Sequence, residues 1–212
     1  MTAVQIQIQD SLAKRILLLY GLHAILSNAS YLIGYYLLPE GFMRGAPQTF
    51  ASELAAKPES FGLEFALTLL FNFTVIVLAV VCNFNQVRGI PAGYAFPVSL
   101  GVVGGLIAGT NSFVADDLSR YSVREGMALA LSVGGLEMLG YILIIAATVK
   151  LGVYQYQSWW RWHGKWKATK IMSLRDVRLS RPEMVTLALG LLLVVFAAYR
   201  ETAMAMNLPV RG

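Results

Sequence analysis

Five apolar segments constrain the fold of this chain more than any other feature. They lie at about residues 15–38, 62–82, 91–114, 127–149 and 184–199. A helix needs about 20 mainly apolar residues to cross the hydrocarbon core of a bilayer. Hydrophobic residues make up 57% of the chain and charged residues 14%, which is unlike a soluble protein. The sequence therefore predicts an all-α, polytopic integral membrane bundle, with residues 1–212 forming a single membrane domain.

The connections between these segments leave little room for a soluble catalytic domain. There is no serine elbow, phosphate-binding loop or triad-like spacing, and the two histidines are too far apart for a local metal motif. The single cysteine, Cys82, excludes an internal disulfide and a cysteine metal cluster. We therefore expect no catalytic residue and no metal site.

Basic residues predict the orientation in the membrane. Most of the 17 lysines and arginines fall in alternate connections on the side of the N-terminus. By the positive-inside rule, the N-terminus is cytoplasmic and, with five spans, the C-terminus lies outside.

The segment 154–181 combines aromatic and basic side chains. Aromatic rings prefer the headgroup layer and lysines attract anionic lipid, so the pattern predicts an interfacial helix on the cytoplasmic leaflet. A docking surface for an anionic cytoplasmic partner would have a similar composition, whereas no other signature indicates nucleic-acid binding. The residues expected at the lipid interface are Trp159, Trp160, Trp162, Trp166, Lys165 and Lys167.

Glu137 is the most unusual residue within an apolar segment. A charged side chain at the centre of a span costs at least about 2.5 kcal/mol, so it needs a polar partner, a cavity or a bound molecule. Asn72 and Asn111 are expected to face the same interior, as a structural hydrogen-bonded network, a proton or transport path, or a ligand contact. Glu64, by contrast, is expected near the outer boundary in contact with water.

Glycines line one face of the third segment, in the spacing of a glycine zipper. Gly101, Gly105 and Gly109 recur every four residues, and Gly134 and Gly135 belong to a second small run before Glu137. Helices approach closely at such faces, so we expect packing within one subunit or self-association, with the third and fourth segments packed together.

His23 lies in a polar stripe of the first segment with Ser27, Asn28 and Ser30. Two interpretations stay open for His23: a hydrogen bond to a neighbouring helix, or axial ligation of a haem or chlorophyll through a neutral imidazole. The sequence itself does not indicate a particular cofactor.

The second to fourth segments resemble the stage II sporulation protein M family, integral membrane proteins of many bacteria and archaea. The resemblance rests on Phe71-Asn72, Gly101 to Gly109, Asn111-Ser112-Phe113 and the run from Gly134 to Glu137. The family usually has proline and histidine where this chain has Ser132 and Val133. The resemblance implies a prokaryotic cytoplasmic membrane and a subunit of a larger complex, with no defined reaction.

Two functions follow from these patterns. The first is a non-catalytic membrane subunit or scaffold that assembles with other membrane proteins. The alternative is a small transporter or channel component with a polar path around Glu137, Asn72 and Asn111. A transporter requires a cavity at Glu137 that reaches water on at least one side. A scaffold requires a dry, fully hydrogen-bonded Glu137 and an outward-facing apolar or glycine surface.

Overall fold

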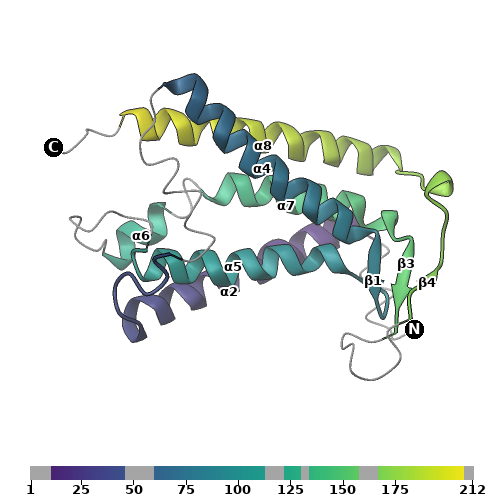
Figure 1. The fold of residues 1–212 in the computed structure, drawn as a ribbon, viewed down its shortest axis with the longest axis horizontal. Coiled ribbons are helices and arrows are strands. Elements are labelled where there is room, and N and C mark those ends of the chain that lie inside the picture. Colours follow the sequence, from purple (N-terminus) through teal and green to yellow (C-terminus); the bar gives the residue numbers. More distant parts are fainter. Residues whose placement is uncertain (1–10, 46–59, 113–121, 130–133, 158–166, 208–212) are drawn as a thin grey trace.

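The computed structural model describes residues 11–45, 60–112, 122–129, 134–157 and 167–207, which are mainly helical (Figure 1). Four helices are long and apolar enough to cross a membrane, which agrees with the first, second, third and fifth predicted segments. They are α2 (Leu12–Leu37), α4 (Phe61–Asn83), α5 (Ala95–Gly109) with the preceding 3-10 turn η1 (Ala92–Tyr94), and α8 (Arg181–Asn207).

The fourth predicted segment differs from the other four. The structure describes it as α6 (Val123–Leu129), α7 (Gly135–Thr148) and the 3-10 turn η3 (Val149–Leu151), with residues 130–133 outside the described part. The 14 residues of α7 extend about 21 Å, which is shorter than a bilayer core. Ile142, Ile144 and Ala146 are completely buried. In α7 the apolar run therefore forms the protein core, and the described residues do not confirm a fifth span.

The helices form two layers with α7 at the centre. Helices α2 and α5 pack against each other along most of their length (Figure 1). Helix α7 packs along α8 and also contacts α2 and α4. Leu19, Ile76, Tyr94 and Ile145 belong to the hydrophobic core that joins these layers. Figure 1 shows α2 and α8 beginning at the same end of the bundle, where α4 and α7 end.

The glycine face of α5 packs against α2, so the predicted pairing of the third and fourth segments is wrong. A Cβ atom at Gly105 would lie 2.4 Å from the carbonyl oxygen of Ser27, and one at Gly109 would lie 2.3 Å from that of Tyr31. The partner surface on α2 includes Gly34, whose own Cβ would be 3.1 Å from the Leu106 carbonyl oxygen. Both helices present small residues here, which allows their backbones to approach.

A second close contact joins α7 to α8. A Cβ at Gly140 would lie 3.0 Å from the carbonyl oxygen of Gly190, and a Cβ at Gly190 would lie 2.9 Å from that of Gly140. This reciprocal pair places α8 against the most buried helix of the fold.

A small four-stranded sheet covers one end of the bundle, which an all-α fold does not include. The strands are β1 (Asn85–Val87), β2 (Ile90–Pro91), β3 (Tyr154–Tyr156) and β4 (Thr169–Lys170). Their order is β2-β1-β3-β4, with β1 parallel to β3 and the other pairs antiparallel. Strands of two or three residues carry no alternating pattern, so the sequence does not reveal them.

The predicted interfacial helix over residues 154–181 is wrong for the described part of that segment. Strands β3 and β4 and the 3-10 turn η5 (Leu174–Asp176) occupy it, because β3 pairs with β1 and β4 pairs with β3 in place of helical hydrogen bonds. Lys167 is exposed. The remaining predicted interface residues, Trp159, Trp160, Trp162, Trp166 and Lys165, lie outside the described residues.

A buried ionic cluster joins three helices at the end of the bundle that carries the sheet. Glu183 Oε1 lies 3.6 Å from Arg15 Nη1 and 3.0 Å from Lys150 Nζ. Arg15 Nη1 also donates to the Ala146 carbonyl oxygen at 2.9 Å. Arg15 and Glu183 are buried, whereas Lys150 is half exposed. The carboxylate of Glu183 therefore neutralises the buried positive charge of Arg15.

Candidate functional site

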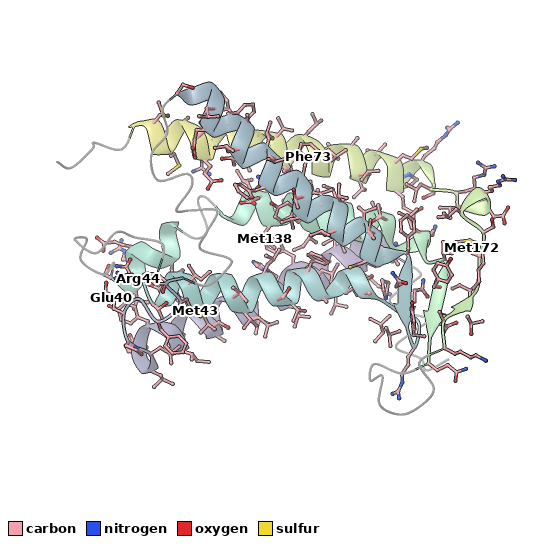
Figure 2. The ribbon with its side chains drawn as sticks, viewed as in Figure 1. Glu40, Met43, Arg44, Phe73, Met138 and Met172 are labelled. Carbon is pink, nitrogen blue, oxygen red and sulfur yellow. The ribbon has the colours of Figure 1, made fainter. Side chains whose placement is uncertain are left out.

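A cavity of about 440 Å³ lies between the two helix layers. Residues of α2, α4, α5, α6 and α7 line it, and Figure 2 shows Met138 in the space between α7 and α5. Its polar lining residues are Tyr20, His23, Ser27, Asn28, Tyr31, Asn72, Glu137 and Tyr141. This volume falls within the range of about 300–1,000 Å³ found for small-molecule sites.

Glu137 lies in the first turn of α7 and forms one side of the cavity. Tyr141, one turn later on the same helix, donates its hydroxyl hydrogen to Glu137 Oε1 at 2.5 Å. The side-chain nitrogen of Asn72, oriented toward α7, lies 3.1 Å from the same oxygen and 3.0 Å from Tyr141 Oη. The predicted association of Glu137 with Asn72 therefore exists, and Tyr141 is a third member that the sequence reasoning missed.

The two donors both bind Oε1 of Glu137. Its second oxygen, Oε2, has no hydrogen-bond donor among the residues that the structure describes. An ionised carboxylate has about four acceptor positions, so two donors satisfy only part of its capacity. The carboxylate therefore has capacity for a further donor, which a cavity occupant can supply.

His23 contacts the neighbouring helix, as one of its two interpretations expects. Its Nδ1 lies 2.9 Å from the Pro97 carbonyl oxygen. A carbonyl oxygen only accepts, so Nδ1 carries the hydrogen and Nε2 of the neutral ring is an acceptor. Ligation of a haem or chlorophyll through Nε2 stays a prediction.

Glycines shape the cavity as well as the helix contacts. Added Cβ atoms at Gly104, Gly134 and Gly135 would meet nothing within 4 Å, and all three residues line the cavity. Among the described residues, none has an atom within 4 Å of these Cβ positions, so the expected packing role of Gly134 and Gly135 stays a prediction. By contrast, a Cβ at Gly101 would lie 3.0 Å from His23 Nδ1, so Gly101 does pack against α2.

Asn111 does not contact Glu137. The predicted network of Glu137, Asn72 and Asn111 is therefore wrong for Asn111. Its amide donates to Glu40 Oε1 at 2.7 Å, in the loop that follows α2. Figure 2 shows Glu40, Met43 and Arg44 together in this loop. Asn111 has a positive φ of 54° at the end of α5, where asparagine is tolerated better than most residues. Asn111 therefore connects the end of α5 to the loop that follows α2.

Three carboxylates are connected electrostatically through Glu201, which interacts with Glu137 and with Glu64, and sequence reasoning did not indicate this connection. Glu64 is buried, with 4% of its surface exposed, which differs from the expected contact with water. Glu201 on α8 is half-buried and interacts electrostatically with both Glu64 and Glu137. Their convergence depends on the packing of α4, α7 and α8, so no local spacing indicates it.

The described residues contain no group of three or more histidine, cysteine, aspartate or glutamate side chains that could hold a metal ion.

Comparisons with protein-family models, with curated proteins and with solved structures found no match to this chain.

Proposed function

We propose that this chain is a polytopic integral membrane protein that binds a small molecule between its helices, as a transporter or channel component. One observation carries the proposal: a cavity of about 440 Å³ has on its wall the incompletely hydrogen-bonded carboxylate of Glu137. Ionisable groups within membrane segments usually mark substrate or ion paths.

The outward faces of the long helices support a membrane location. Ile25 on α2, Leu70 on α4 and Leu192 on α8 are 69%, 61% and 66% exposed. Apolar side chains exposed along whole helices are unfavourable in water and stable against lipid tails. We propose the cytoplasmic membrane of a prokaryote, with the sheet and the start of α2 on the cytoplasmic side and the end of α8 outside.

The scaffold function predicted first has less support in the site. The glycines of α5 pack against α2 within the chain, which is one of the two roles expected for them, and the pair Gly140 and Gly190 joins α7 to α8. Assembly with other membrane proteins and the resemblance to the stage II sporulation protein M family stay predictions.

The experiment that tests the proposal is cysteine accessibility in membrane vesicles. Cys82 is the single cysteine, so Cys82→Ser provides a cysteine-free background. Ala24→Cys places a thiol on the cavity wall, and Ile25→Cys places one at the same depth on the outward face of α2. A charged, membrane-impermeant thiosulfonate reacts with a thiolate, which forms only where water reaches.

We expect the reagent to modify Ala24→Cys from both sides of the membrane and to leave Ile25→Cys unmodified. Reaction from both sides indicates a site with alternating or continuous access to water. Protection of Ala24→Cys from both sides would contradict the transport proposal and favour the scaffold. Reaction from one side alone would reduce the proposal to a binding site without passage.

A further inference from the structure

We propose that the cavity binds a protonated amine that carries an apolar body. This inference rests on the proposed binding function and names its ligand class.

The charge of the cavity wall selects a cation. Glu137 is the only carboxylic acid among the described lining residues, and these include no lysine or arginine that would pair with it. Its Oε1 already accepts from Tyr141 and Asn72, whereas Oε2 accepts from no described residue. A charged donor on Oε2 would form the type of hydrogen bond that is strongest in proteins.

The acceptors of the wall favour a protonated amine over a quaternary ammonium. His23 has an acceptor in Nε2, because its Nδ1 donates to the Pro97 carbonyl oxygen. The amide of Asn28 donates to the Ala24 carbonyl oxygen at 2.7 Å, and its own oxygen is a further acceptor. A primary ammonium offers three N–H donors, and a quaternary ammonium offers none.

The remaining wall suits an apolar body. Tyr20, Tyr31 and Phe71 supply aromatic rings, and Met138 supplies a flexible thioether. Aromatic rings attract cations through their faces and bury apolar groups through their area. The glycines at positions 104, 134 and 135 leave room for this body, since Cβ atoms there would meet nothing within 4 Å.

Ligand binding to the full-length protein in lipid nanodiscs tests this inference. The probes are 2-phenylethylamine, the neutral 2-phenylethanol and the anionic 3-phenylpropionate, measured by isothermal titration calorimetry. We expect the amine to bind more tightly than the other two. Glu137→Gln should weaken amine binding by about 10- to 100-fold, because it removes the charge from one hydrogen-bonded contact. Binding of the alcohol should change little.

Three variants keep this test independent of folding. Gln at position 137 still accepts from Tyr141 and Asn72, so Glu137→Gln should keep the thermal unfolding temperature of the wild type. Gly104→Leu fills the cavity from an open position and should abolish binding of the amine. Glu125→Gln changes an exposed carboxylate that does not line the cavity, and it should leave all affinities unchanged.

The outcomes separate this inference from the proposed function. Equal affinity for the amine and the alcohol, or an unchanged affinity in Glu137→Gln, would overturn the amine assignment, and labelling of Ala24→Cys would still establish a water-accessible site. A preference for the trimethylated analogue of the amine would also overturn it. Absence of binding for every probe together with protection of Ala24→Cys would overturn both.

Discussion

Glu137 shows how a few side chains keep a carboxylate inside an apolar bundle. Tyr141 and Asn72 reach the same oxygen from two different helices, so the group is held in one orientation while part of its acceptor capacity is unused. Oε2 accepts from none of the described residues, and the proposed binding function rests on this unused capacity.

Tyr141→Phe tests how strongly this orientation is held. The change removes the hydroxyl that donates to Glu137 and keeps the ring, so we expect a loss of about 1 kcal/mol in the free energy of unfolding. The measurement is unfolding in mixed detergent micelles. In the background of Glu137→Gln the same change should cost less, because the hydrogen bond to a charged group is already absent.

Tyr199→Phe is the matched control. Tyr199 is half exposed and its ring contacts Phe61 and Phe65, which phenylalanine at this position retains. A loss in Tyr199→Phe as large as that in Tyr141→Phe would show that hydroxyl removal alone accounts for the effect.

The helix α5 has two glycine surfaces with different roles. Gly101, Gly105 and Gly109 lie against α2, and Gly105 also reaches the cavity wall, whereas a Cβ at Gly104 would meet no atom within 4 Å. Adjacent residues of one helix therefore have different neighbours.

Alanine substitution should separate these two surfaces. Gly105→Ala places a Cβ 2.4 Å from the Ser27 carbonyl oxygen, so the helices must separate. We expect a loss of about 1–3 kcal/mol in unfolding free energy, as for other overpacked cores. Gly104→Ala meets no atom within 4 Å, and its higher helix propensity should leave stability unchanged or raise it by up to about 1 kcal/mol. Equal losses in the two variants would contradict the assigned surfaces.

The short helix α6 should depend on pH through its capping box. Ser122 Oγ and its backbone nitrogen donate to Glu125 Oε2 at 2.6 and 3.0 Å, and these hydrogen bonds lower the pKa of Glu125 from its ordinary value of 4.5. A lowered pKa in the folded state stabilises the helix above the ordinary value, and this contribution is lost as the pH falls through the lowered pKa.

Amide hydrogen exchange across residues 123–129 measures this dependence after correction for intrinsic rates. Protection should decrease as the pH falls below 4.5. Glu125→Gln retains a side chain that can complete the capping box and removes its titration, so protection in this variant should lose the pH dependence. A parallel decrease in both proteins would contradict the role of Glu125.

The molecule as a whole has polar groups at both ends of its helix layers. The end with the sheet is held by Glu183 with Arg15 and Lys150, and the opposite end by the loop after α2, whose Gly41 nitrogen donates to the Thr110 carbonyl oxygen at 2.7 Å. The cavity lies between these two closures. Its dimensions should therefore depend on contacts that do not touch it.

Glu183→Gln should destabilise the whole bundle. Glutamine keeps the hydrogen bonds from Ser180 that cap α8, while Arg15 loses a buried carboxylate. Removing one partner of a buried ion pair typically costs about 3–5 kcal/mol, and we expect the lower limit because the Arg15 contact is long. Lys150→Gln removes a half-exposed partner and should cost less than about 1 kcal/mol. Thermal unfolding of both variants in the same detergent measures the difference, and a larger effect at Lys150 would contradict this order.

Local pattern was sufficient to predict the long helices and to identify Glu137 as a carboxyl group that needs a polar partner. Sustained apolar runs in α2, α4, α5 and α8 need no tertiary information, because length and hydropathy determine whether a helix can cross a membrane. An isolated carboxylate in such a sequence must find a partner or a cavity wherever it lies. These conclusions depend on single segments and their composition.

Contacts between distant segments determined the remaining features. The sheet forms because the ends of α4 and α7 bring β1 beside β3, and neither strand is long enough to be recognised alone. Asn72 donates to Glu137, whereas Asn111 does not. The glycine face of α5 packs against α2, and this packing places Asn111 beside Glu40 in the loop that follows α2. Periodicity shows that a helix has an apolar or glycine face, but the choice of neighbour depends on how all the surfaces fit together, and that choice created the cavity.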